Sequence, residues 1–300
     1  MCMKINNKNQ QVITAYFFII PGLILYIVFL VYPILKAFQI SFYEWSIMPG
    51  ELNKFVGLAN YVRAYSDPIV GLSLRNTIIY TIVTVPGQMI LALLIALLLN
   101  NITKGKIFFR TVYYIPVVTS WVVVSLLFKY LFQSPKGIIN YMLVNVLHVI
   151  QKPVPWLQVA STAFIPVLAL GIWKGIGWTM VIFLAALQTI PPELYEVAEI
   201  DGANGWQKLI KITLPLIRPT LVFTLVMLMI GGFNVFLSVV LITDGGPLRK
   251  TEVILSYMYH QAFDYLDFGY GAALSFILAL IIVTISFLQI RFLRKPKELA

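Results

Sequence analysis

Long apolar stretches dominate this 300-residue sequence and restrict what it can fold into. A helix needs about 20 residues, at 1.5 Å each, to cross a hydrocarbon core of about 30 Å. Six stretches reach that length, and they lack the period-two alternation that a transmembrane β-barrel needs. The predicted spans are Ile13–Leu35, Asn76–Leu99, Thr111–Phe132, Ala163–Leu187, Leu216–Ile242 and Ala272–Phe292. We therefore predict an all-α integral membrane protein with six transmembrane helices.

The composition excludes most soluble classes and offers no catalytic constellation. Hydrophobic residues are 60% and charged residues 11%, against about 45–50% and about 25% in soluble domains. The single cysteine, Cys2, excludes an internal disulfide and a thiolate metal cluster. His148 and His260 are too few and too scattered for a triad or a metal site, and no phosphate-binding P-loop occurs. We expect this chain to be no enzyme and to bind no metal or cofactor itself.

The basic residues predict an orientation in the membrane. The formal net charge is +10, and lysine and arginine are densest in the segments that six spans would place on the side of the N-terminus. Cytoplasmic loops carry such an excess, so both termini are expected in the cytoplasm. The first apolar run is too long for a signal peptide and is interpreted as an uncleaved anchor. The expected parts are a cytoplasmic N-terminus (1–12), a transmembrane domain (13–292) with external segments near 41–75, 133–160 and 243–270, a cytoplasmic loop (190–219) and a basic cytoplasmic tail (293–300).

Polar groups inside the predicted spans mark two candidate regions. Lys174 lies about 20 Å from the cytoplasmic end of its span. At that depth a lysine is costly, so it is either paired internally or part of a polar substrate path. Gly175 and Gly177 beside it permit close helix approach or a local break. In the fifth span, the Gly231–Asn234 segment can loosen the helix, or pack as small residues at helix interfaces do.

These regions define the candidate substrate path, in which aromatic side chains could stack on sugar rings or simply pack. Its residues are Lys174, Trp173, Trp178, Phe233, Asn234 and Phe236. Every Asp and Glu falls outside the six spans, which weakens an ion-coupled carrier as an interpretation.

The segment between the fourth and fifth spans predicts two short helices. Pro191 and Pro192 suit a helix start, and Glu193 complements the positive end of its dipole. Gly202 can close this helix in a left-handed conformation, and a second helix should begin near Asn204 and end before Pro215. An acidic helix with small apolar residues is either a solvated connector or a plug for a basic groove on a cytosolic partner.

The same segment resembles the EAA loop of bacterial ABC-type importers, whose coupling helix docks into a cleft of the ATP-hydrolysing subunit. Val197 and Leu209 depart from the family pattern but stay apolar. The resemblance implies coupling roles for Glu196, Ala198, Asp201, Gly202, Ala203, Trp206, Ile212 and Pro215.

Other motifs resemble carbohydrate-importer permeases of the maltose and glycerol-phosphate type. These are Phe55–Tyr61, Asn76-Thr77, Trp173–Gly177, and Leu241–Pro247 followed by Thr251, Tyr257 and Gly269-Tyr270. The region Tyr16–Trp45 resembles the first permease of the pair. The resemblance implies a type I ABC-importer permease fold in a bacterial plasma membrane.

The function implied by this resemblance is ATP-driven import of a sugar or oligosaccharide, acidic and phosphorylated sugars included. The implied partners are a second permease, two ATPase subunits that use ATP and magnesium, and an external solute-binding protein, with no nucleic acid. An amino-acid, peptide or polyol importer of the same architecture remains an alternative. An ATP-independent carrier or channel is an alternative of another class, and a membrane-embedded enzyme is disfavoured by the missing catalytic cluster.

Overall fold

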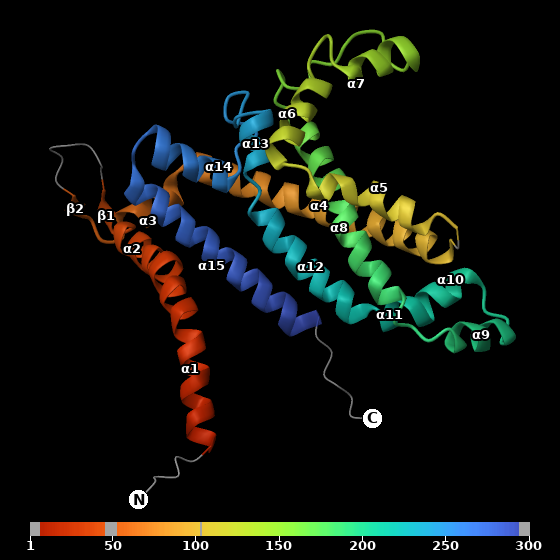
Figure 1. Ribbon diagram of the computed structural model, residues 1–300. Coiled ribbons are helices and arrows are strands. Elements are labelled where there is room, and N and C mark those ends of the chain that lie inside the picture. Colours follow the sequence, from red (N-terminus) through yellow and green to blue (C-terminus); the bar gives the residue numbers. More distant parts are fainter. Residues whose placement is uncertain (1–6, 46–52, 103, 294–300) are drawn as a thin grey trace, which may run out of the picture. The chain divides into compact units, whose positions relative to one another are not determined.

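The computed structural model describes residues 7–45, 53–102 and 104–293 (Figure 1). The chain forms two compact units. One consists of Met1–Ser66 with Met258–Phe276, and the other of Asp67–Tyr257 with Ile277–Ala300. Among the described residues, four helices are long and apolar enough to cross a membrane, or up to six if each of two bent helix pairs is one span.

The first unit begins with a long helix that is more extensive than the predicted span Ile13–Leu35. Helix α1 (Asn7–Tyr26), a π-helical turn (Ile27–Val31) and α2 (Tyr32–Ile40) follow one another without a break. The most apolar 18-residue window of Thr14–Ile40 has a mean hydropathy of 2.5 and no buried residue. An apolar helix that its own unit leaves uncovered suits a lipid or protein surface in the membrane.

A small polar cluster organises the rest of the first unit. Strand β1 (Tyr43–Glu44) pairs antiparallel with β2 (Lys54–Phe55), and α3 (Ala59–Ser66) follows. Asn60 donates to the carbonyls of Ser41 (2.9 Å) and Tyr43 (3.0 Å). A Cβ on Gly269, at the start of α15 (Phe268–Leu293), would collide with the Tyr43 carbonyl. The cluster thus brings together residues of two of the motifs that the sequence analysis singled out.

Three helices form the centre of the second unit: α4 (Pro68–Asn101), α8 (Ile165–Leu187) and α12 (Arg218–Phe233) (Figure 1). Asp67 caps α4 by accepting from the Ile69 amide at 2.9 Å, and Pro68 takes the first helical position. The cap extends α4 beyond the predicted start at Asn76. Side chains buried between α4 and α8 include Ala92, Ala96, Met180, Phe183 and Leu184.

The prediction of one uninterrupted helix over the third span, Thr111–Phe132, is wrong. The chain forms α5 (Lys106–Val118) and α6 (Trp121–Leu131), which are bent by 94° at the break. Thr119 and Ser120 have extended backbone angles there. Pro116 contributes no amide hydrogen to the end of α5, which weakens the last turn of that helix.

The fifth predicted span, Leu216–Ile242, is also divided. Helix α12 ends at Phe233, and α13 (Leu237–Ile242) begins three residues after Asn234 caps it. Gly231–Phe233 are still helical, so the interruption begins only at Asn234. Two short elements, α7 (Ile138–Tyr141) and a π-helical turn (Met142–Val146), occupy the segment before α8.

The loop after α13 is fixed to α4 by buried polar side chains. Asn76 donates to the carbonyls of Lys250 (2.9 Å) and Glu252 (2.8 Å). The Ile254 amide, at the start of α14 (Ile254–Tyr259), donates to Thr77 Oγ1 at 3.1 Å. Tyr257 donates its hydroxyl to Asp67 at 2.6 Å. Two motifs far apart in the sequence thus contact one another. After α14 the chain continues through a π-helical turn (His260–Asp264) into α15.

Candidate functional site

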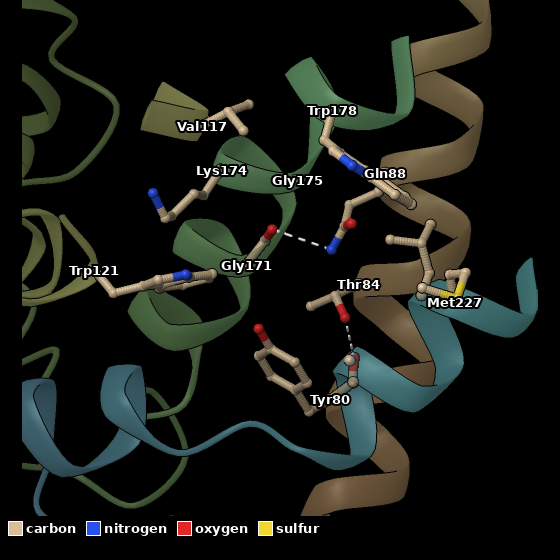
Figure 2. A pocket seen from close by; sticks show the side chains of 13 residues that line it. Tyr80, Thr84, Gln88, Val117, Trp121, Gly171, Lys174, Gly175, Trp178 and Met227 are labelled. Carbon is tan, nitrogen blue, oxygen red and sulfur yellow. Dashed lines mark hydrogen bonds between the residues drawn. The ribbon is translucent and has the colours of Figure 1, made fainter. Parts of the chain in front are cut away.

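A pocket of about 240 Å³ lies within the second unit, among α4, α5, α6, α8 and α12 (Figure 2). The pocket is lined by aromatic residues, glycines, aliphatic and polar residues, and one charged residue, Lys174. The lining residues are Tyr80, Thr84, Gln88, Val117, Trp121, Gly171, Lys174, Gly175, Trp178, Met227, Leu228, Gly231 and Gly232.

Helix α4 contributes the polar wall of the pocket. Tyr80, Thr84 and Gln88 recur at every fourth residue, so they lie on one face of the helix (Figure 2). Thr84 donates to the Tyr80 carbonyl at 2.8 Å, and Gln88 donates to the Gly171 carbonyl at 3.1 Å. The hydroxyl and amide dipoles are therefore held in fixed directions next to the cavity.

Glycines allow α8 to approach its neighbours closely. A Cβ on Gly171 would collide with the Tyr80 ring, and one on Gly175 would collide with Gln88. Gly177 faces the other way, against the Tyr113 carbonyl of α5. Helix α8 runs without interruption from Ile165 to Leu187, so these glycines serve close approach rather than a break.

Lys174 is buried, with 4% of its surface exposed. Its ammonium donates to the carbonyls of Pro116 and Thr119, both at 2.7 Å. The same nitrogen lies 4.8 Å from the centre of the Trp121 ring. Figure 2 shows its side chain on the Val117 and Trp121 side of the pocket, across from Gln88. Lys174 is thus both internally hydrogen-bonded and part of the pocket wall.

The structure brings only two of the six predicted substrate-path residues, Lys174 and Trp178, to this pocket. The Trp173 ring instead contacts Phe128, with ring centres 5.6 Å apart. The other three do not line the pocket: Phe233 is buried, Phe236 is half-buried, and Asn234 is exposed and donates to the Ile230 carbonyl at 2.8 Å.

Sequence reasoning missed the contribution of α4. The signal was present, because three residues with polar groups at a spacing of four are unusual in such an apolar stretch. The position of Trp121 had no comparable signal, since it depends on the bend between α5 and α6. No group of three or more His, Cys, Asp and Glu that could hold a metal occurs among the described residues.

The second candidate region is the loop between α8 and α12. Helix α9 (Glu193–Ile200) follows Pro191 and Pro192, as predicted, and Gly202 has the predicted left-handed conformation with a φ of +78°. Helix α10 (Gly205–Lys208) starts with a capping box, in which Asn204 and Gln207 bond reciprocally.

The predicted end of this second helix before Pro215 is wrong. Helical turns continue through a π-helical turn (Leu209–Thr213) into α11 (Leu214–Leu216). The wide turn shifts the hydrogen-bond register just before Pro215, so the missing amide hydrogen of the proline is accommodated. Arg218 then starts α12 after a bend of 69°.

The loop exposes apolar side chains beside acidic ones. Leu194, Val197 and Ile200 of α9 are 43%, 57% and 85% exposed, and Trp206 is 69% exposed. Most of the predicted coupling residues are exposed too, whereas Ala198, Ala203 and Ile212 are half-buried. Tyr195 and Thr213 hydroxyls lie 2.9 Å apart, and Lys208 pairs with Glu199 at 3.0 Å. The loop is therefore a folded element whose outer surface carries both apolar and acidic side chains.

Comparison with known proteins identifies the family. The family model described as "binding-protein-dependent transport system inner membrane component" matches residues 64–297. The chain belongs to this family. It is a multi-pass membrane permease of the ABC type, as the sequence motifs predicted.

Relatives and a solved structure agree with this membership. The lactose transport system permease protein LacF of Rhizobium radiobacter is 34% identical over 97% of each chain. The arabinooligosaccharides transport system permease protein AraP of Bacillus subtilis is 35% identical over 92% of this chain and 87% of that one. A chain of a bacterial ABC transporter involved in import of the acidic polysaccharide alginate is 25% identical, with a TM-score of 0.84 over 96% of this chain and 98% of that one. The predicted type I permease fold is confirmed.

Proposed function

We propose that this chain is a transmembrane subunit of an ATP-driven importer for a sugar or oligosaccharide. In the proposed assembly it pairs as the first permease with a second one. Two ATPase subunits use ATP and magnesium on the cytoplasmic side, and an external binding protein delivers the substrate. The observation that carries the proposal is the exposed apolar surface of α9. The chain holds a pocket but its sequence contains no ATP-binding loop, so an ATPase subunit would have to dock on such a surface.

The loop of α9 and α10 has the properties of a docking element. Exposed Leu194, Val197 and Ile200 would lose water on docking, which stabilises an interface at about 25 cal/mol per Å² of apolar area buried. Glu196 and Asp201 have no ion pair among the described residues and could meet a basic rim on the partner. Because Gly202 turns the chain between the two helices, movement of the partner would be passed through α10 and α11 to α12.

The pocket suits a ligand with many hydroxyl groups. Trp121 offers an aromatic surface across from Gln88, and Trp178 offers one beside Gln88 (Figure 2). Thr84 and Gln88 also offer hydrogen-bonding atoms. A saccharide presents both apolar ring faces and hydroxyls, so this combination favours it over a purely apolar ligand. The permease relatives named for lactose and arabinooligosaccharides support a sugar substrate, and the alginate importer extends the range to acidic sugars.

Gly202→Asp tests the docking element, because it adds a charged side chain at the turn that the partner would contact. We expect the variant to lose at least about tenfold of the ATPase that co-purifies from native membranes, equivalent to about 1.4 kcal/mol of docking free energy. Gly57→Asp is the matched control, since Gly57 also has a positive φ (+56°) and open space around it. Equal ATPase recovery in wild type and Gly202→Asp would contradict the assignment.

The alternatives are separated by the substrate that the partners accept. A co-purified binding protein titrated with neutral and acidic oligosaccharides, polyols, amino acids and peptides should bind only saccharides. Binding of an amino acid, peptide or polyol alone would move the proposal to the corresponding importer. Uptake that persists with an inactive ATPase would favour a carrier or channel instead.

A further inference from the structure

Lys174 occupies a position where a membrane protein rarely keeps a charge. It lies on α8, is 4% exposed, and is the only charged residue in the pocket lining. None of the residues that line the pocket from α4, α5, α6 or α12 is a carboxylate. Its ammonium is stabilised by two backbone carbonyls and the Trp121 ring, and no carboxylate of the described residues forms an ion pair with it.

The two carbonyls belong to the break between α5 and α6. Helix α5 ends at Val118, and the last carbonyls of a helix have no partner within it. Pro116 and Thr119 supply the two oxygens that receive the Lys174 protons at 2.7 Å. A cation at this end also complements the negative pole of the helix dipole. The Thr119 hydroxyl also donates to the Pro116 carbonyl at 2.7 Å, so Lys174 adds a second donor at Pro116 and donates to the Thr119 carbonyl from another helix.

The break sets the position of one pocket wall. Val117 lies in the last turn of α5 and Trp121 opens α6, so both change position if the bend of 94° changes. The Trp121 ring lies 4.8 Å from the ammonium that holds the break. The same side chain thus contacts the carbonyls before the bend and the aromatic ring after it.

We propose that Lys174 is a positioning residue that clamps the α5–α6 bend and so fixes Val117 and Trp121 at the pocket. Its importance for substrate binding rests on the proposed function, whereas the clamp itself does not. A test that needs neither substrate nor ATP therefore separates the two: failure of the clamp would leave the import proposal intact.

The bend can be measured with two spin labels in the full chain reconstituted in lipid nanodiscs. Cys2→Ser removes the native cysteine, and Phe108→Cys and Leu127→Cys place labels on exposed positions of α5 and α6. At 1.5 Å per residue, their Cα atoms lie about 20 Å apart across a bend of 94° and about 28 Å apart along a straight helix. The difference is well within the resolution of pulsed dipolar spectroscopy.

Lys174→Met keeps the length of the aliphatic side chain and removes the three donors. We expect its distance distribution to broaden and extend by up to about 8 Å, while Lys129→Met, which changes an exposed lysine of α6, keeps the wild-type distribution. An unchanged distribution in Lys174→Met would overturn the clamp. If that variant does not fold, Lys174→Arg decides: its guanidinium can donate to the same carbonyls, so a wild-type distance supports the clamp and a broadened one contradicts it.

Discussion

Three buried polar side chains of this protein bond to the backbone of segments far away in the sequence. Asn60 donates to the Ser41 and Tyr43 carbonyls, Asn76 to those of Lys250 and Glu252, and Lys174 to the α5–α6 break. In a non-polar environment an unpaired carbonyl is costly, so each of these residues stabilises an irregular segment by donating to its carbonyls.

Asn76→Ala should show this cost most clearly. It removes both donors at an 8% exposed position and leaves the Lys250 and Glu252 carbonyls without them. We expect a loss of about 1–3 kcal/mol in the free energy of unfolding, measured as a lower thermal midpoint in detergent. Asn101→Ala, at an exposed position near the end of the same helix, is the control and should change stability little. Equal midpoints for the two variants would show that the loop does not depend on Asn76.

At the scale of helices, glycine spacing decides how closely α8 packs. A Cβ at Gly177 would meet backbone atoms of Tyr113, which cannot move without shifting α5. Gly177→Ala should therefore destabilise the protein by about 1–3 kcal/mol, the usual cost of overpacking. Gly71→Ala in α4 is the matched control, because nothing lies within 4 Å of its added Cβ and alanine favours the helix. The thermal midpoints of both variants measure the difference in stability, and the mobility of a spin label on α5 near Tyr113 reports the shift of that helix. A thermal midpoint of Gly177→Ala at or above that of the wild type would contradict the prediction.

How much of each helix the sequence predicts follows from where its determinants lie. Four of the six apolar stretches became helices without a bend: Thr14–Ile40, α4, α8 and α15. Asp67 and Pro68 could have predicted the early start of α4, because both are local signals. The bend after Val118 could not be predicted in the same way, since its carbonyls are satisfied by Lys174 from a helix more than 50 residues later.

The candidate sites also combine features that neighbouring residues determine with features that depend on contacts between distant segments. The helix start at Pro191-Pro192 and the left-handed Gly202 depend on neighbouring residues, and both were predicted. The pocket depends on which faces of α4, α8 and α12 meet, so Gln88 was missed, and Asn234, which was predicted for the substrate path, does not line this pocket. Their positions in a common lining are a tertiary property that periodicity within one helix only partly indicates.

For the whole molecule, the remaining prediction is its orientation in the membrane. Dense basic segments favour the cytoplasmic side, so the loop of α9 and α10 should face the cytoplasm and the segment before α8 should face outward. Both segments contain an exposed lysine, Lys211 and Lys136, which allows a matched pair of single-cysteine variants in a Cys2→Ser background. Each variant removes only one of the 22 lysines and arginines, so the bias that sets the orientation is largely kept in both.

A membrane-impermeant maleimide applied to right-side-out vesicles should label Lys136→Cys at once and Lys211→Cys only after the vesicles are opened with detergent. The reverse order would show that the basic segments face outward, and the ATPase could then not dock on α9. This outcome would contradict the proposed coupling loop even if the pocket and the Lys174 clamp were both correct, because docking requires α9 on the side where ATP is available. Labelling in the expected order would leave the exposed surface of Leu194, Val197 and Ile200 on the cytoplasmic side, where a partner can cover it.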